Sequence, residues 1–286
     1  MNYAFSIENL HFKYPTSKDD TIKGISFNVK EGEIFGLLGP SGAGKSTTQK
    51  ILIKLLENYQ GNIKYFGKDL KSMDKSFYEE IGVGFEMPVH FCKMTALENL
   101  KFFSGFYKQT INIQELMERV GLWEDRNIKV GEYSKGMKVR LNFVRSMLNN
   151  PRVLFLDEVT NGLDPKNARI IKDIISEFRA KGGTVFLSTH LMNDVEQLCD
   201  NIAFCVNGKL NEISTPRDLK LKYGKREVRI EYKENGATHS ALFPLEAIGV
   251  NEEFQNILKN KEIETIHSGE TSLEEIFITL TGVELK

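Results

Sequence analysis

The segment 39–46 joins residue types whose spacing suits the binding of a phosphate. It reads Gly-Pro-Ser-Gly-Ala-Gly-Lys-Ser, follows the apolar run 34–38 and precedes a helical pattern that begins near Ser46. Glycines permit backbone angles that let successive N–H groups converge on one anion, and the positive end of the helix dipole adds to the attraction. Lys45 is placed to reach the β- and γ-phosphates of a nucleotide, and the Ser46 hydroxyl is placed to bind Mg²⁺.

Two adjacent carboxylates, Asp157 and Glu158, end the apolar run 153–156. A continuous apolar run of this length is typical of a buried parallel strand, and α/β proteins bind their ligands at the carboxyl ends of such strands. The two carboxylates therefore mark a second candidate part of a ligand site. A further buried strand is predicted at 184–188, and His190 follows it closely.

Two polar residues stand where helices are expected to begin. Ser134 occupies an N-cap position, and Asp164 caps a helix whose first position is Pro165. Tyr14 follows the first strand and is placed to stack its ring on an adenine. An ordinary surface or core aromatic is an equal alternative for Tyr14.

The elements that must position these residues alternate between strands and helices, as in an α/β protein. Strands at 5–10 and 25–29 predict an antiparallel β-layer beside the phosphate-binding strand. The stretch 91–148 is mainly helical in pattern, and such an insertion predicts a subdomain. Beyond Pro216 the pattern predicts a linker helix, strands near 227–232 and 239–243, and a last helix at 272–281.

Two features of the helical stretch carry structural predictions. Thr95 is expected to cap a helix with Glu98, three residues on, as its reciprocal partner. An aromatic series lies in the same stretch, and such a series belongs to a core more often than to an interface, so we expect it to be buried. The series consists of Phe91, Phe102, Phe103, Phe106 and Tyr107.

Composition argues against several classes of function. The chain has 286 residues, of which 41% are hydrophobic and 27% charged, as in an ordinary globular protein. Its formal net charge of -1 provides no global basic field, so we expect no nucleic-acid partner. The longest apolar runs are strand-sized and far short of the ~20 residues that cross a bilayer, so we expect no membrane span. The 3 cysteines form no CxxC pair, and we expect them to be structural.

In their order along the chain, these motifs resemble those of the nucleotide-binding subunit of an ATP-binding cassette (ABC) transporter. The resemblance spans about residues 3–215, and the tail 272–282 is similar to the end of ABC-2-type export ATPases. The matching motifs are Walker A at 39–46, the signature at 134–137, Walker B at 153–158, the D-loop at 161–164 and the switch histidine His190.

This resemblance implies both the fold class and the domains. The fold is expected to be α/β, a P-loop NTPase of ABC type with an antiparallel β-subdomain, a helical subdomain and a small C-terminal α+β appendage. The ABC ATPase domain is expected over residues 1–215, with its helical subdomain at about 88–150. A C-terminal accessory domain is expected over residues 216–286.

The resemblance also implies an ATPase that uses ATP and Mg²⁺. Hydrolysis moves negative charge onto the γ-phosphoryl oxygens, so catalysis consists largely of positioning a water molecule and neutralising that charge. Glu158 is expected to orient or deprotonate the water, and His190 to contact the γ-phosphate. The expected Mg²⁺ ligands are Ser46, Glu86 and Asp157. The expected nucleotide-binding residues are Tyr14, Gly39, Pro40, Ser41, Gly42, Ala43, Gly44, Lys45, Ser46, Thr47, Ser134, Lys135, Gly136 and Asp164.

Two protein partners follow from the same resemblance. The family's signature motif acts across a head-to-tail dimer, so Ser134, Lys135 and Gly136 are expected to close on the ATP of a partner cassette. We expect that cassette to be a second copy of this chain in preference to a different ATPase subunit. A separate transmembrane permease subunit is the other expected partner, and it would hold the chain at the cytoplasmic face of the cell membrane. The surface at 87–100 is expected to receive short helices of that permease.

Two residues depart from the family pattern. Glu86 stands where a glutamine is common, and its carboxylate can still bind Mg²⁺. The added negative charge near the γ-phosphate should weaken nucleotide binding without metal. Lys135 replaces a glycine, and it either adds a positive charge to the partner's ATP or points into solvent. Neither change removes a catalytic group, so we still expect activity.

Two other classes of protein compete with an export subunit. A soluble ABC-type ATPase not linked to transport would need a long coiled coil between the phosphate loop and the signature, or a second cassette, and this sequence has neither. A P-loop kinase or phosphotransferase would not need the signature and D-loop motifs. The leading interpretation is therefore a subunit that energises export.

Overall fold

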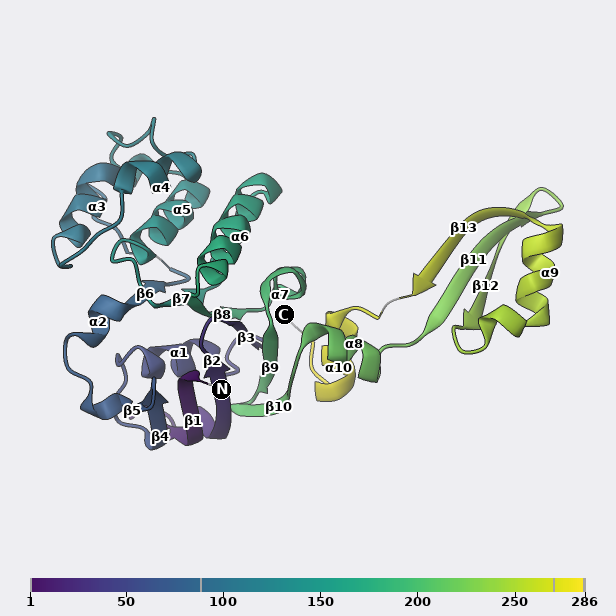
Figure 1. Cartoon of the computed structure of the whole chain (residues 1–286), viewed down its shortest axis with the longest axis horizontal. Coiled ribbons are helices and arrows are strands. Elements are labelled where there is room, and N and C mark those ends of the chain that lie inside the picture. Colours follow the sequence, from purple (N-terminus) through teal and green to yellow (C-terminus); the bar gives the residue numbers. More distant parts are fainter. Residues whose placement is uncertain (1, 88, 270, 285–286) are drawn as a thin grey trace. The chain divides into compact units, whose positions relative to one another are not determined.

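The computed structural model describes residues 2–87, 89–269 and 271–284 (Figure 1). The chain divides into two compact units, one running to Thr215 and the other spanning Pro216–Val283. Every motif predicted to bind nucleotide lies in the first unit. None of the described helices is both long enough and apolar enough to cross a membrane.

The first unit is built on a six-stranded sheet of β3 (Ile34–Leu38), β6 (Ile81–Gly84), β7 (Val153–Asp157), β8 (Thr184–Thr189), β9 (Asn201–Val206) and β10 (Lys209–Ser214). The strand order is β10-β9-β3-β8-β7-β6. All neighbours pair in parallel except β10, which is antiparallel to β9. Every residue of β3, β7 and β8 is buried, as expected for the centre of a parallel sheet. The predicted α/β fold class is confirmed.

An antiparallel sheet of four strands lies in the same unit, in the order β2-β1-β4-β5. Its strands are β1 (Tyr3–Phe12), β2 (Ile22–Lys30), β4 (Gln60–Tyr65) and β5 (Lys68–Asp69). Aromatic rings join this sheet to the central one. The ring of Phe5 lies 5.6 Å from that of Phe155, and Phe27 stacks on Phe35 at 5.2 Å. The predicted β-layer is therefore present and shares one hydrophobic core with the phosphate-binding strand.

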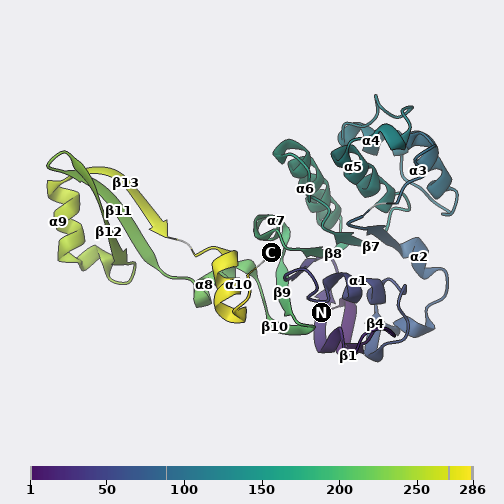
Figure 2. The ribbon, with the colours of Figure 1, turned by 180° about the vertical axis from the view of Figure 1, so that it is seen from behind.

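Helices of two groups complete the first unit. Those that connect strands are α1 (Lys45–Leu52), α2 (Phe77–Glu80), α6 (Pro165–Ala180) and α7 (Met192–Leu198), and short 3-10 turns occur at Leu70–Ser72 and Val130–Glu132. The second group is α3 (Ala96–Ser104), α4 (Ile113–Arg119) and α5 (Lys135–Ser146), which lie together at one end of the unit in both views (Figure 1, Figure 2). Thr95 and Glu98 form the predicted capping box at the start of α3.

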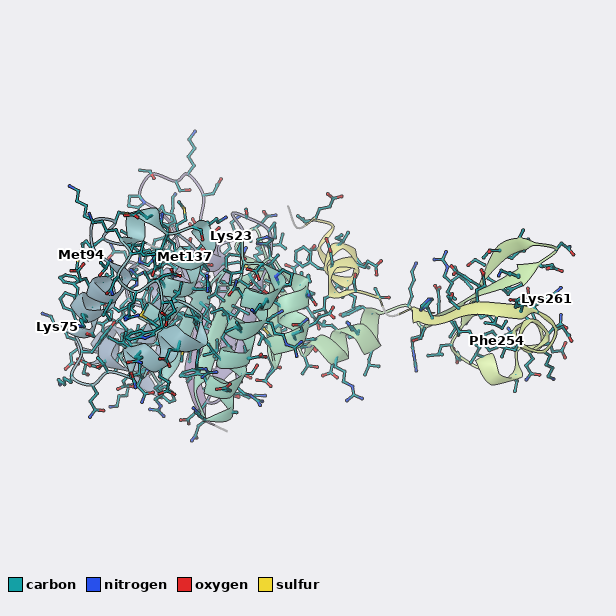
Figure 3. The ribbon with its side chains drawn as sticks, turned by 90° about the horizontal axis from the view of Figure 1, so that it is seen from above. Lys23, Lys75, Met94, Met137, Phe254 and Lys261 are labelled. Carbon is teal, nitrogen blue, oxygen red and sulfur yellow. The ribbon has the colours of Figure 1, made fainter. Side chains whose placement is uncertain are left out.

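The second unit begins with α8 (Pro216–Tyr223) and ends with α10 (Leu273–Thr281). Its antiparallel sheet has the order β12-β11-β13, formed by β11 (Glu227–Glu234), β12 (Ala237–Pro244) and β13 (Glu262–Gly269). A 3-10 turn at Ile248–Val250 leads to α9 (Glu252–Asn260), which was not predicted, and neither was β13. Ile230, Phe243 and Ile257 form a small core, and the ring of Phe254, marked in Figure 3, lies 5.3 Å from that of Phe243.

Candidate functional site

Two glycines of the loop after β3 lie very close to residues of other segments. A Cβ at Gly39 would lie 2.0 Å from the carbonyl oxygen of Cys205, and one at Gly44 would lie 2.7 Å from Ile22 Cδ1. Gly44 also has a φ of 106°, which L side chains rarely adopt. No side chain caps α1 at Gly44, so the first N–H groups of the helix remain available to an anion.

Lys45, the first residue of α1, is almost entirely buried. It is 7% exposed and donates to the carbonyl oxygens of Gly39 at 2.6 Å and Pro40 at 3.1 Å. These partners are neutral, and a phosphate oxygen in their place would form a stronger, charge-assisted hydrogen bond. Lys45 is therefore positioned at the loop, as a phosphate-binding lysine requires.

The two carboxylates at the end of β7 are both buried but have different partners. The Ser188 hydroxyl donates to Asp157 Oδ1 at 2.5 Å. Glu158 Oε2 accepts from the Thr189 hydroxyl at 2.9 Å, and its Oε1 accepts from the backbone N–H of His190 at 3.1 Å. Glu158 has a φ of 51°, a left-handed conformation that costs a non-glycine residue about 1–2 kcal/mol. The strained turn directs its carboxylate toward the end of β8.

His190 completes a pair with Glu158. Its Nδ1 lies 2.8 Å from Glu158 Oε1, and the Glu158 side chain is 7% exposed against 39% for His190. The contact fixes the ring through one nitrogen and leaves Nε2 as the ring nitrogen able to meet a ligand. A histidine held in this way can contact a phosphate while it orients the buried carboxylate.

These residues surround one cavity of about 340 Å³. The cavity brings together half of the residues predicted to bind nucleotide or metal, and both predicted catalytic residues. Thr21 was not predicted, because nothing in its loop distinguishes it from other polar residues. The lining residues are Thr21, Ser41, Gly42, Gly44, Lys45, Ser46, Thr47, Glu86, Asp157, Glu158 and His190.

Tyr14 lies beside this cavity and is not among its lining residues. Its hydroxyl is 3.3 Å from that of Thr47, and its ring packs edge-on to Phe12 with centroids 4.9 Å apart. The ring is therefore adjacent to the phosphate loop and is partly committed to packing. Its proposed contact with an adenine stays a prediction.

The signature residues do not line the cavity. Ser134 caps α5 as predicted, because its hydroxyl accepts from the backbone N–H of Met137 at 3.2 Å. Lys135 is exposed, and whether its charge meets the ATP of a partner or only solvent stays a prediction. Its side chain lies over Gly162 of the D-loop, where an added Cβ would be 3.0 Å from Lys135 Cε. The signature and the D-loop of one chain are thus in contact.

The helix after the D-loop begins as the sequence predicts. Asp164 caps α6 by accepting from the backbone N–H of Asn167 at 3.0 Å, and Pro165 is its first residue. These hydrogen bonds hold the pKa of Asp164 below its ordinary value. Asp164 does not line the cavity either, so within one chain it acts as a cap.

A buried polar network behind the D-loop was not predicted. The hydroxyl of Thr160 donates to Asp194, which is 7% exposed, and Lys172 Nζ lies 3.1 Å from Asp194 Oδ1. Asp194 belongs to α7, the helix that follows His190. The network therefore ties the segment after Glu158 to the helix that follows His190. The contributing residues are far apart in sequence, so no local pattern reveals it.

Two family models match this chain. Residues 22–161 match the model described as ABC transporter, and residues 226–270 match the model described as Fluoroquinolone efflux ABC transporter C-terminal domain. The second match covers part of the second unit, including all three strands of its sheet.

Similar proteins include transport subunits and a solved cassette structure. The chain is 46% identical to a fluoroquinolones export ATP-binding protein of Mycobacterium tuberculosis, over 98% of this chain and 93% of the relative. It is 37% identical to the bacitracin transport ATP-binding protein BcrA of Bacillus licheniformis, over 67% of this chain and 64% of the relative. A solved ATP binding subunit of an ABC transporter matches with a TM-score of 0.70 and 28% identity, covering 77% of this chain and 93% of that one.

Proposed function

Since this chain belongs to the ABC transporter family of ATP-binding proteins, we propose that it binds and hydrolyses ATP to energise export through a separate membrane subunit. The observation that carries the proposal is the single cavity that joins the phosphate loop, the carboxylate pair and His190. A relative that is 46% identical is named for fluoroquinolone export, so a fluoroquinolone is the first compound to test as cargo.

The residues that line the cavity support the binding of ATP together with Mg²⁺. Lys45 and the N–H groups at the start of α1 would hold the phosphates. Ser46, Glu86 and Asp157 line the same cavity and would supply hard oxygen ligands to the ion. The described residues hold no group of three or more His, Cys, Asp or Glu side chains able to bind a metal. Mg²⁺ would therefore bind together with the nucleotide phosphates and neutralise their charge.

The fixed positions of Glu158 and His190 support the roles proposed for them in hydrolysis. Glu158 is buried and keeps both carboxylate oxygens on fixed donors, so it can orient an attacking water and accept its proton. His190 Nε2 would contact the γ-phosphate while Nδ1 stays on Glu158. Fixed groups of this kind stabilise developing charge without rearranging during the reaction.

One chain supplies only part of this arrangement, and we propose that a second copy supplies the rest. Ser134 and Lys135 are exposed at the start of α5 and do not line the cavity of their own chain. In a head-to-tail dimer the start of α5 would close on the partner's ATP. Bound ATP would hold the two cassettes together, and its hydrolysis would release them.

The membrane subunit is proposed to dock on the surface around 87–100 and to hold the chain at the inner face of the membrane. Met87 is 83% exposed and Val89 is 81% exposed, which is unusual for apolar side chains. Replacing both by serine should uncouple ATPase activity from transport while leaving nucleotide binding intact. Unchanged transport by this variant would exclude the surface as the coupling site.

The central test is size and Mg-ATP turnover of the purified chain and its Glu158→Gln variant. We expect ATP, but not ADP, to convert the variant into a stable dimer, and its turnover to fall by at least about 100-fold. A variant that hydrolyses ATP at the parent rate would contradict the role of Glu158. If turnover falls but no dimer forms, adding the membrane subunit shows whether closure needs it; a monomer in its presence would contradict the dimer.

A further inference from the structure

Three buried polar side chains link α1 to the end of β7 beside the nucleotide cavity. They are Gln49 of α1, Ser188 of β8 and Asp157 of β7. The Ser188 oxygen lies 2.5 Å from Asp157 Oδ1 and 3.0 Å from Gln49 Oε1. The sequence did not predict these contacts, because the residues that they join lie far apart in the chain. We refer to the three residues as the polar triad.

The number of available protons decides the direction of the hydrogen bonds in the polar triad. A serine hydroxyl has one proton to donate, and an ionised carboxylate can only accept. The proton of Ser188 therefore belongs to the shorter contact, with Asp157. The Ser188 oxygen then presents only lone pairs to Gln49. A half-turn of the Gln49 amide places Nε2 in the position of Oε1, and from there the nitrogen can donate to Ser188.

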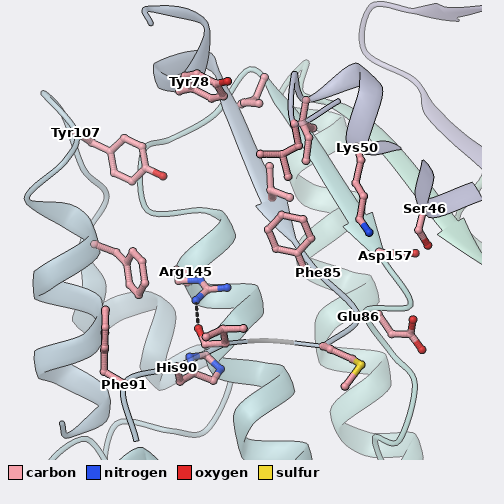
Figure 4. A pocket seen from close by; sticks show the side chains of 17 residues that line it. Ser46, Lys50, Tyr78, Phe85, Glu86, His90, Phe91, Tyr107, Arg145 and Asp157 are labelled. Atoms are coloured by element: carbon pink, nitrogen blue, oxygen red, sulfur yellow. Dashed lines mark hydrogen bonds between the residues drawn. The ribbon is translucent and has the colours of Figure 1, made fainter. Parts of the chain in front are cut away.

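The polar triad occupies one oxygen of Asp157 and leaves the other available to a ligand. Within the part of the chain that the structure describes, no donor contacts Asp157 Oδ2. Asp157 lines the nucleotide cavity together with Ser46 and Glu86. The same three residues line a neighbouring cavity of about 700 Å³, and Figure 4 shows them on one side of it. Oδ2 is therefore the oxygen of Asp157 that can meet an ion bound at Ser46.

Each member of the polar triad belongs to a regular element next to the proposed ion site. Gln49 lies in α1 three residues after Ser46, so the two share one side of the helix. Asp157 and Ser188 are opposite each other in the parallel pair of β7 and β8. The hydrogen bonds of the triad therefore set the position of the Asp157 carboxylate relative to the helix that carries Ser46. A metal ligand oriented in this way needs little rearrangement when the ion binds.

Ser188 and the next residue of β8 act on different carboxylates. Successive residues of a strand point to opposite faces of the sheet. Ser188 donates to Asp157, whereas Thr189 donates to Glu158. The carboxylate proposed to bind the ion and the carboxylate proposed to activate water are thus held by separate hydroxyls. A change at Ser188 should affect the binding of the ion without removing the donor of Glu158.

We propose that Gln49 and Ser188 are positioning residues that orient Asp157 for the divalent cation of the nucleotide. Gln49 donates to Ser188, Ser188 donates to Asp157 Oδ1, and Oδ2 is left for the ion. This inference rests on the proposed function, because it assigns two further residues to the metal side of the same ATP site. Hydrogen-bonding partners of metal ligands typically contribute about 10- to 100-fold to metal affinity or activity.

The test measures how strongly Mg²⁺ improves nucleotide binding, without any turnover. A non-hydrolysable ATP analogue is titrated into the full chain by calorimetry, once in excess Mg²⁺ and once in EDTA. The Kd in EDTA divided by the Kd in Mg²⁺ is called the metal ratio. Ser188→Ala should lower the metal ratio by about 10-fold. Its Kd in EDTA should stay within about twofold of the parent, because the phosphate loop keeps its own contacts, and this value also shows that the variant is folded.

Gln49 is tested through its dependence on Ser188. Gln49→Met keeps the length of the side chain and removes its polar atoms, so it should lower the metal ratio by about threefold. The double variant should lose no more than Ser188→Ala alone, because Gln49 acts only through Ser188. Losses that multiply to about 30-fold would overturn this arrangement. Ser188→Cys has a weaker donor and should lie between the parent and Ser188→Ala, so it provides the test if Ser188→Ala does not fold.

Ser146 offers a matched control in the same unit. It is a buried serine of α5 whose hydroxyl donates to the carbonyl oxygen of Phe143 at 2.7 Å. It lines neither of the two cavities. Ser146→Ala removes a buried hydroxyl of the same kind and should leave the metal ratio within about twofold of the parent. A fall as large as that of Ser188→Ala would show a general effect of lost packing and would overturn the assignment.

Asp157→Asn separates a failure of this inference from a failure of the proposed function. It should lower the metal ratio at least as much as Ser188→Ala does. If Asp157→Asn lowers the ratio while both Ser188 variants match the parent, Asp157 binds the ion without the polar triad, and only this inference is overturned. If Asp157→Asn also matches the parent, or if the parent ratio is close to one, the proposed binding of Mg²⁺ at Asp157 is wrong as well.

Discussion

The hydroxyl of Thr189 helps to hold the Glu158 carboxylate in place. It donates to Glu158 Oε2 at 2.9 Å and accepts from the backbone N–H of Leu191 at 3.0 Å. The side chain is 2% exposed, so water cannot take over these hydrogen bonds. The buried carboxylate therefore depends on this hydroxyl for part of its orientation.

We predict that Thr189→Val lowers Mg-ATP turnover by about 10- to 100-fold, because small displacements of a catalytic group have effects of that size. Valine keeps the shape of threonine and removes only the hydroxyl. ATP affinity, measured by titration of the isolated chain, should stay within about threefold of the parent, since the phosphate loop is untouched. Thr189→Ser, which keeps the hydroxyl, should retain turnover; equal loss in both variants would contradict the explanation.

His90 predicts a dependence of stability on pH. Its pKa in the folded chain is lowered from 6.5 to about 4, first by burial and then by Arg145. The unfolded chain therefore binds more protons between these values, and the contribution of neutral His90 is lost as pH falls from about 6.5 to 4. Since the His90 side chain is only half-buried, we expect a loss of about 1–2 kcal/mol in the free energy of unfolding.

The measurement is chemical denaturation of the parent and His90→Gln at pH 7 and at pH 4.5. Acidic side chains also gain protons in this range. The difference in stability loss between the parent and His90→Gln therefore isolates the effect of the histidine. The parent should lose more stability than the variant on acidification. A constant difference across this range would show that His90 is not held neutral by the fold.

At the scale of elements, α3 depends on a local cap. Thr95 accepts from the backbone N–H of Glu98 at 3.2 Å, and the Glu98 carboxylate accepts from the backbone N–H of Thr95 at 2.8 Å. Thr95→Ala removes the hydroxyl that accepts from the backbone N–H of Glu98, and it should lower the free energy of unfolding by about 1 kcal/mol. Thr95→Ser should cost less than half as much. Thermal unfolding followed by circular dichroism measures both, and equal losses would contradict capping as the cause.

The features that the sequence predicted correctly are those that depend on local patterns. The phosphate loop, the capping box and the start of α6 were predicted because their residues are neighbours in the chain and interact locally. The buried runs of β7 and β8 were predicted because central parallel strands are apolar throughout. Interactions between neighbouring residues and continuous apolar runs are both good predictors, because the tertiary contacts of the folded chain reinforce them.

What the sequence did not predict depends on contacts between distant residues or on weak periodicity. Asp194 meets Thr160, and Arg145 meets Val89, only after the helices have packed. β13 was missed because its residues are exposed or half-buried throughout, so the strand lacks a buried apolar face. The prediction that the aromatic series of the helical stretch would be buried was wrong in part, because aromatic content alone does not tell a core from an interface. The members that are exposed instead are Phe91, Phe102 and Phe106.

For the whole molecule, the proposed dimer implies that each chain contributes to two different ATP sites. Lys45 and Glu158 line the cavity, whereas Ser134 at the start of α5 lies outside it. In a head-to-tail dimer of identical chains, each site would take its phosphate loop from one copy and its signature from the other. Defects in the two halves should then be separable between chains.

We therefore predict complementation between two inactive variants. Lys45→Ala removes the phosphate contact of its own chain, and Ser134→Arg blocks the N-terminus of α5 that would meet the partner's ATP. A mixed dimer has one site with both defects and one site with neither. Random mixing of equal amounts should recover up to about a quarter of the parent turnover per chain if the sites act independently. Steady-state phosphate release from separate and mixed chains measures this.

The pairing of variants also distinguishes the dimer from simpler arrangements. If each chain completed its own site, both variants would stay inactive in any mixture, because every site would contain one defect. Mixing Lys45→Ala with Glu158→Gln should likewise give no recovery, since both residues line the same cavity in one chain and leave no site intact in the mixed dimer. Recovery in the first mixture and not in the second would place the signature of one copy on the ATP of the other.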